Sequence, residues 1–216
     1  MCTVKLNRLE KLVLIPAFNE ERNIASVIQA CLSFAAVVVI DDGSTDKTAE
    51  VAQRSGAKVL PGISNEGYEA AICRGLKYFV ESGYSACVFV DADGEIAPHS
   101  ANGCLQQLSA NKPLILGRRP SAARFGERVI NAYYSKRHGI EIDACCGCKA
   151  IHLSLLHGLA LEDCVQQSFT NIVSLVSADQ IGVFDIQGKP RTDKPRFGGT
   201  LIGNYRLLRG FLKRFL

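Results

Sequence analysis

Short, uninterrupted apolar runs alternate with longer segments of mixed polarity along the chain. Such runs are typical of strands that are buried on both faces of a parallel sheet. The runs, and hence the expected strands, lie at residues 12–15, 35–40, 58–60, 87–90 and 114–117. The mixed segments predict helices at residues 20–34, 45–54, 68–81 and 122–138. This alternation predicts an α/β fold with a mostly parallel, doubly wound sheet and helices on both of its faces.

Local signals predict where several of these elements begin and end. Pro16 ends the first run, since proline cannot donate to a strand ladder. Asn19 is well placed to cap the helix at 20–34, and Ser44 or Thr45 to cap the helix that ends near residue 54.

Acidic side chains directly follow two of the expected strands. Asp42 lies just beyond the second run, and Asp91 and Asp93 lie just beyond the fourth with only Ala92 between them. Ligands of open α/β sheets bind at this carboxyl edge. Two carboxylates this close can share a hard divalent cation, and substrate phosphates complete its shell. The sequence therefore predicts a Mg²⁺ or Mn²⁺ site formed by the two aspartates at residues 91 and 93.

Two other interpretations of the same aspartates remain open. A solvated, Asp-rich turn that closes a strand has the same composition. Phosphatases of the haloacid dehalogenase type also place Asp-x-Asp after an apolar strand, with the first aspartate as nucleophile. That motif normally lies on the first strand and continues with Thr or Val, whereas Glu95 follows Gly94 here.

Loops at the same edge supply further candidate contacts. Asp42 is expected to bind a ribose or a base, and the backbone near Asn65 and Gly67 to approach a phosphate closely. The convergence of three loops, after residues 15, 40 and 90, favours a binding site more strongly than any one of them alone.

Composition narrows the class of protein. The chain has 216 residues, 47% of them hydrophobic and 21% charged, which predicts one globular domain at 1–200 and an appendage at 201–216. No apolar stretch is long enough to cross a membrane, and the first residues do not resemble a signal peptide. Nine cysteines, an odd number, suit a reducing compartment. We therefore expect a cytoplasmic protein.

The charges are unevenly distributed although the net charge is only +4. Basic residues gather after residue 116, whereas much of the acidity precedes residue 95, so the second half is expected to meet anionic partners. Nucleic acid is not expected among them, because tryptophan is absent and the cations are not interleaved with stacking aromatics.

Four ordered motifs carry a resemblance to a known family: VLIPAFNEERNI, VVVIDDGSTDKTAEVA, NEGYEAAICRGL and VFVDADGEIAP. Together they resemble the nucleotide-sugar half of a family 2 glycosyltransferase with the GT-A fold. The resemblance implies a donor-binding half at 1–98 and an acceptor half at 99–200. It implies that UDP- or GDP-linked sugar is bound, with Mg²⁺ or Mn²⁺ at the Asp-x-Asp pair, by residues Pro16, Ala17, Asn19, Glu20, Asp42, Ser44, Asn65, Gly67, Asp91, Ala92 and Asp93.

The second half is similar to the polyprenyl-phosphate branch of that family, which carries Gly-Ser-Arg and later Asp-x-x-x-Gly-Phe-Arg/Lys. Segments 117–119 and 143–149 occupy those places, and Cys148 departs from the usual Phe. The resemblance implies catalytic roles for four residues: Asp93, Arg118, Arg119 and Asp143. It implies phosphate or acceptor contacts for Lys149, Arg191 and Arg196. The role of Asp143 is left open. It acts as a base, it positions the acceptor, or it is a structural loop carboxylate paired with Lys149 or Arg137.

The last residues, 204–216, place leucines and phenylalanines on one helical face and arginines and lysines mostly on the other. Such a basic amphipathic helix lies on an anionic bilayer surface or packs its apolar side on the domain. The first alternative predicts a protein held peripherally on the cytoplasmic face of a membrane. Association with further copies of the chain stays open.

Three functions follow from these observations. The first is an inverting, metal-dependent transfer of a sugar from a nucleotide sugar to a dolichyl or undecaprenyl phosphate. The second is transfer to a hydroxyl of a glycan or a small molecule, for which a general base is needed. The third is a nucleotide-sugar-binding adaptor without catalysis.

Overall fold

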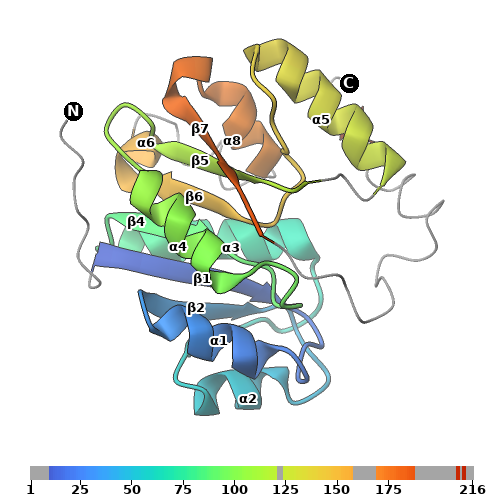
Figure 1. Ribbon diagram of the computed structural model, residues 1–216. Helices are drawn as coiled ribbons and strands as arrows, with labels where there is room; N and C mark the ends of the chain where they lie inside the picture. Colours follow the sequence, from blue (N-terminus) through green and yellow to red (C-terminus); the bar gives the residue numbers. More distant parts are fainter. Residues whose placement is uncertain (1–9, 121–123, 158–168, 188–207, 210, 213–216) are drawn as a thin grey trace.

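The computed structural model describes residues 10–120, 124–157, 169–187, 208–209 and 211–212. Within this part of the chain, seven strands form one sheet in the order β3-β2-β1-β4-β6-β5-β7 (Figure 1). Their bounds are β1 Lys11–Ala17, β2 Ala36–Asp41, β3 Lys58–Pro61, β4 Ala86–Phe89, β5 Leu114–Arg118, β6 Lys149–His152 and β7 Ile181–Asp185. All five strands expected from the apolar runs are present, and β6 and β7 are additional.

The strand directions confirm a mostly parallel sheet. β1 pairs in parallel with β2 and β4, β2 with β3, and β5 with β7. β6 runs antiparallel to both of its neighbours, β4 and β5. The amino end of β6 therefore lies beside the carboxyl end of β4, where Lys149 pairs with Phe89.

The helices cover the sheet as the alternation predicts. They are α1 Ile24–Leu32, α2 Thr48–Arg54, α3 Tyr68–Glu81, α4 Pro98–Gln107, α5 Phe125–His138, α6 Leu153–His157 and α8 Phe169–Leu175, with a 3-10 turn, η2, at Ala178–Gln180. α3 has the predicted bounds. α5 ends at the predicted residue, where Gly139 (φ 66°) supplies the left-handed cap. α4 was not predicted.

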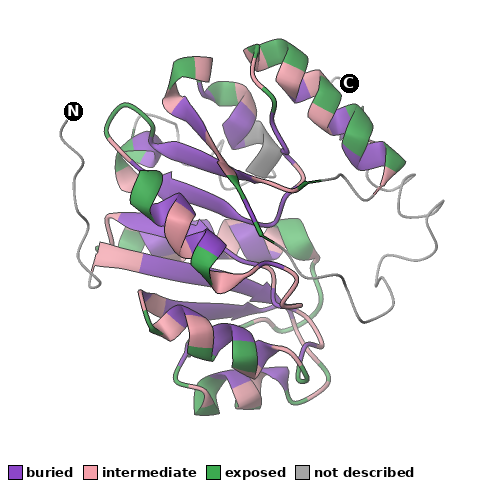
Figure 2. Ribbon diagram, in the orientation of Figure 1, coloured by how far each residue is buried: buried purple, intermediate pink, exposed green. Residues whose placement is uncertain are grey.

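Two apolar cores lie on opposite faces of the sheet, because successive residues of a strand point to opposite sides. Leu12 and Leu14 of β1 join the core that is covered by α3 and α5. Val13 and Ile15 join the core that is covered by α1 and α4. Figure 2 shows the strands as an almost continuous buried layer between half-exposed helices.

The predicted helix caps are wrong. α1 begins only after Asn23, and α2 begins after Lys47. Asn19 instead adopts a left-handed conformation with φ 55°, which asparagine tolerates better than most residues. Asn19 and Ser44 form hydrogen bonds between loops, because tertiary partners compete with the free amides of a first helical turn.

Only four residues of the expected C-terminal helix are described, and all four are helical. Phe211 is buried with its ring 5.2 Å from Tyr133 and 6.2 Å from Tyr134 of α5, whereas Leu212 is exposed. The domain boundary expected at residue 200 lies outside the described residues. No described helix combines the length and the apolar character that a bilayer crossing requires.

Candidate active site

Two loops at the carboxyl edge of the sheet are tied together by hydrogen bonds. The amide of Asn19 donates to Ser44 Oγ at 2.9 Å, and the amide of Thr45 donates to Asn19 Oδ1 at 2.8 Å. The amide of Glu20, a buried residue, donates to Thr48 Oγ1 at 2.7 Å. The loops after β1 and β2 thus form one unit, as expected for parallel strands that end at the same edge.

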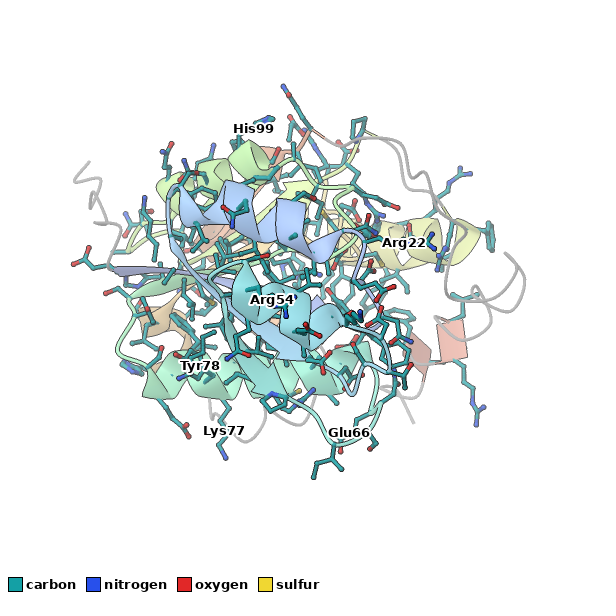
Figure 3. All side chains as sticks on the ribbon, turned by 90° about the horizontal axis from the view of Figure 1, so that it is seen from below. Arg22, Arg54, Glu66, Lys77, Tyr78 and His99 are labelled. Carbon is teal, nitrogen blue, oxygen red and sulfur yellow. The ribbon has the colours of Figure 1, made fainter. Side chains whose placement is uncertain are left out.

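Asp42 fixes the loop between β3 and α3, which lies at the same edge. Its buried carboxylate accepts the amide of Gly67 at 2.8 Å through Oδ2 and the amide of Glu66 at 3.3 Å through Oδ1. The side chain of Glu66 lies at the outer margin of the molecule (Figure 3). Gly43, which has φ 70°, permits this approach, since a Cβ there would lie 2.5 Å from the carbonyl carbon of Ser64.

Arg74 is a site residue that the sequence did not reveal. Its Nη2 donates to Asp42 Oδ1 at 3.2 Å and to the carbonyl of Asp41 at 3.0 Å. It comes from α3, whose buried stripe contains Ala71 and Gly75. The helical period puts Arg74 at the edge of that stripe, facing the sheet. A basic residue at the edge of an apolar helical stripe was therefore the sequence signal that could have identified Arg74.

Asp91 and Asp93 lie beyond the carboxyl end of β4, as predicted. Asp91 Oδ1 accepts the hydroxyl of Tyr68 at 3.1 Å, and Asp93 Oδ1 accepts the amide of Glu95 at 3.0 Å. Burial raises the pKa of Asp91 above its ordinary value, and the negative charge of Asp93 raises it further. The two carboxylates are therefore close enough to repel each other, and a shared cation would remove that repulsion.

The donor set fits Mg²⁺ or Mn²⁺. Both ions prefer oxygen ligands, and Mg²⁺ typically takes one or two carboxylates from the protein and the rest from water and substrate phosphates. In the described ranges no three His, Cys, Asp or Glu side chains gather into a complete metal cage. Asp91 and Asp93 would hold such an ion only together with a phosphorylated substrate or water. Ala92 between them is buried.

The loop before β6 packs directly on Asp91. A Cβ on Gly147 would overlap the carboxylate of Asp91, so only glycine permits this approach. Lys149, the first residue of β6, is buried, and its positive charge lowers the pKa of Asp91. The second half of the chain thus reaches the Asp-x-Asp pair.

Asp143 is paired with Arg119, not with Lys149 or Arg137. Arg119 donates through Nε to Asp143 Oδ2 at 2.7 Å and through Nη2 to Oδ1 at 3.0 Å. The side-chain amide of Asn131 donates to the same Oδ1 at 2.8 Å, and Glu127 lies 3.2 Å from Arg119 Nη2. Burial alone would raise the pKa of Asp143, but these hydrogen bonds and the charge of Arg119 lower it below the ordinary value.

Arg118 has a different environment from its neighbour. It donates to Asp185 at 2.6 and 3.1 Å and to Glu141 at 2.9 Å, and both of these carboxylates are exposed. Arg118 is the last residue of β5, and Arg119 is the first residue after it. The charge of Arg119 contributes to lowering the pKa of Asp91, so the structure brings Arg119 close to the Asp-x-Asp pair.

Cys148, the residue that departs from the family pattern, is buried in the core. Its sulfur lies 3.6 Å from that of Cys104 on α4, and its amide donates to Cys146 Sγ at 3.4 Å. Cys148 therefore has a packing role at this edge. The seven cysteines in the described part of the chain are free thiols. Arg191 and Arg196 lie outside the described residues.

The fold and this edge of the sheet define a GT-A type glycosyltransferase that uses a nucleotide sugar. The chain belongs to glycosyl transferase family 2, whose model matches residues 12–150. It is therefore an enzyme of the glycosyltransferase class, and the predicted family is confirmed.

Individual relatives differ in how much of their length is matched. An uncharacterized glycosyltransferase of Mycobacterium tuberculosis is 27% identical over 93% of this chain and 95% of its own length. The polyprenol monophosphomannose synthase of Mycolicibacterium smegmatis is 32% identical over 50% of this chain, but the match spans only 44% of that protein.

Solved structures confirm the fold. The glucosyl-3-phosphoglycerate synthase of M. tuberculosis, in complex with Mn²⁺, UDP-glucose and glycerol 3-phosphate, superimposes with a TM-score of 0.74. The match covers 95% of this chain and 80% of that protein at 21% identity.

Proposed function

We propose that this enzyme transfers a sugar with inversion from a nucleotide sugar to a polyprenyl phosphate, in a reaction that depends on Mg²⁺ or Mn²⁺. The observation that carries the proposal is the meeting of Asp91 with the loop before β6, because Gly147 and Lys149 bring the acceptor half against the Asp-x-Asp pair. The similarity to a polyprenol monophosphomannose synthase supports the acceptor class.

The donor occupies the edge formed by the loops after β1, β2 and β3. Asp42 and Arg74 recognise the nucleoside, with Pro16, Ala17 and Asn19 beside them. Asn65 and Gly67 lie on the loop that Asp42 fixes. Asp91 and Asp93 face the diphosphate, and a divalent ion there would stabilise the negative charge that develops on the leaving nucleoside diphosphate.

Arg119 and Lys149 supply positive charge on the acceptor side. A lipid phosphate is already anionic near pH 7, so its oxygen attacks the anomeric carbon without a strong general base. This suits Asp143, whose lowered pKa makes it a weak base. We assign Asp143 the role of holding Arg119 in place for the acceptor.

A hydroxyl acceptor is the second candidate. Arg119 is already neutralised by Asp143 and Glu127, and Arg118 by Asp185 and Glu141. These ion pairs reduce the net positive charge that the two arginines present, and a hydroxyl acceptor, unlike a lipid phosphate, does not require that charge. The fold neighbour named for glucosyl-3-phosphoglycerate illustrates a small acceptor.

A transfer assay separates the two candidates. The full chain is incubated with radiolabelled UDP- and GDP-sugars, with Mn²⁺ or EDTA, and with or without undecaprenyl and dolichyl phosphate. Label that enters the organic phase only with metal and lipid phosphate supports the proposal. Metal-dependent transfer to water-soluble acceptors alone would replace it by the second candidate.

The basic segment at 201–216 is proposed to contact the bilayer. If it does, the full chain should bind vesicles that contain anionic lipids.

Gly147→Ala is expected to weaken Mn²⁺ binding at least about tenfold, because its Cβ would displace the Asp91 carboxylate. Isothermal titration in the presence of UDP or GDP measures the change. Gly139→Ala is the matched control: φ is 66° there and a Cβ meets no neighbour within 4 Å. It should lower stability by about 1 kcal/mol and leave Mn²⁺ binding unaltered. Equal Mn²⁺ affinities in both variants would contradict the assignment.

Arg74→Met is expected to weaken binding of the nucleoside diphosphate about tenfold, since a hydrogen bond to a charged group is lost at Asp42. The base is unidentified, so UDP and GDP are both titrated. Lys77→Met on the same helix, whose side chain points away from the sheet in Figure 3, should bind like the wild type. Unchanged affinity in Arg74→Met would remove Arg74 from the nucleoside site.

A further inference from the structure

Tyr68 joins the loop between β3 and α3, which Asp42 fixes, to the Asp-x-Asp pair. It is the first residue of α3, and its hydroxyl donates to Asp91 Oδ1 at 3.1 Å, in the loop after β4 and 23 residues away in the sequence. The opposite oxygen of the same carboxylate faces Gly147. The Asp91 carboxylate is therefore held between a tyrosine hydroxyl and a closely packed backbone.

The position of Tyr68 is itself fixed by Asp42. The amides of Glu66 and Gly67, the two preceding residues, donate to the Asp42 carboxylate, and Arg74 of the same helix donates to it from the next turns. Both sides of the α3 amino terminus are thus tied to one buried acid. A displacement of this segment moves the Tyr68 hydroxyl relative to Asp91.

We propose that Tyr68 is a positioning residue that holds Asp91 for the divalent cation and couples the cation site to the nucleoside site at Asp42. The inference rests on the proposed function, which assigns the cation to Asp91 and Asp93. Groups that orient a metal-binding carboxylate commonly change metal affinity about 10- to 100-fold when they are removed. Tyr68 is partly exposed, so the lower end of that range applies.

The coupling has a measurable consequence. A nucleotide that contacts Asp42 acts on the segment that carries Tyr68, and a cation at Asp91 acts on the Tyr68 hydroxyl. Each ligand must then change the affinity of the other by the same factor. In the wild type we expect a nucleoside diphosphate to raise Mn²⁺ affinity beyond the direct contribution of its phosphates. Without the Tyr68 hydroxyl that excess should disappear.

Tyr68→Phe removes the hydroxyl and keeps the ring. The matched control is Tyr78→Phe on the same helix, whose ring lies under the Lys58 ammonium at 4.7 Å, away from the aspartates. Mn²⁺ binding is measured by electron paramagnetic resonance on the full chain in three states: alone, with UDP and with GDP. Uridine and guanosine, which lack phosphates, are titrated separately, with and without Mn²⁺.

We expect Tyr68→Phe to bind Mn²⁺ about tenfold more weakly than the wild type and to lose the effect of the phosphate-free nucleoside, while Tyr78→Phe retains both. Equal Mn²⁺ affinities in Tyr68→Phe and the wild type would overturn the inference and leave the proposed function intact. A wild type that retains no Mn²⁺ even with UDP or GDP would overturn both, and the two failures are thereby distinguished.

Discussion

Asp91→Asn is expected to lower kcat/KM at least about 100-fold, because an amide cannot supply the negative charge that a divalent cation and the leaving diphosphate require. Asp93→Asn should act similarly. The change should cost little stability, since the Asn oxygen still accepts the Tyr68 hydroxyl and the repulsion from Asp93 is removed. Steady-state kinetics and thermal unfolding on the same samples separate the two effects.

A suitable control for this loss is Asp179→Asn. Asp179 is an exposed acid in η2, so its replacement changes the net charge equally and should leave kcat/KM within about twofold of the wild type. If Asp91→Asn retained full activity with Mn²⁺, the Asp-x-Asp pair would be a structural turn, as one interpretation of the sequence holds.

Arg119→Met is expected to destabilise the protein by about 3 kcal/mol or more, because it leaves the buried carboxylate of Asp143 without its main partner. Urea denaturation measures this loss. Arg119→Met combined with Asp143→Asn should cost much less than the sum of the two single changes, since the uncompensated charge is gone. Additive losses would show that the pair does not act as a unit.

Arg118→Met, at the preceding residue, provides the comparison. Its partners Glu141 and Asp185 are exposed, so its loss should cost below about 1 kcal/mol. Both arginine variants are then assayed for transfer. A loss of activity in Arg119→Met that exceeds its unfolded fraction assigns Arg119 to the acceptor site.

The pH dependence of the Asp143 variant follows from the direction of its pKa shift. The folded-state pKa of Asp143 lies below its ordinary value of 3.8. Its contribution to stability is therefore fully present above pH 3.8 and is lost as the pH falls through the folded pKa. The stability difference between wild type and Asp143→Asn should shrink on acidification below that pH. A difference independent of pH would contradict the ion pair.

The sequence predicted the donor half well because its signals are local. Apolar runs and the acids that follow them place β1, β2 and β4 and their loops without any tertiary information. The sequence did not predict β6, because Lys149–His152 has charged or polar residues at both ends and no alternation. α4, whose ten residues include Ser, Asn and Gly, lacks a clear helical period for the same reason.

The contacts within the site depend on residues far apart in the chain. Asn19 has the composition of a helix cap, yet its partners are Ser44 and Thr45, 25 and 26 residues away. Asp143 lies six residues from Lys149, but its partner is Arg119, 24 residues before it. Sequence spacing alone favours partners that are close in the chain. The partners seen here are brought together only when the sheet forms.

Among the described strands, β6 is the one that runs against its neighbours, and this direction has a consequence for how the enzyme can be altered. Because β6 runs against β4, the segment that leads into it arrives at the catalytic edge from the second half of the chain. The Asp-x-Asp pair of the first half and the segment before β6 are therefore distant in the sequence but adjacent in the fold. Under the proposed function, a graft of residues 143–148 from a relative with another acceptor is expected to change the product, provided that the graft keeps glycine at position 147 beside Asp91.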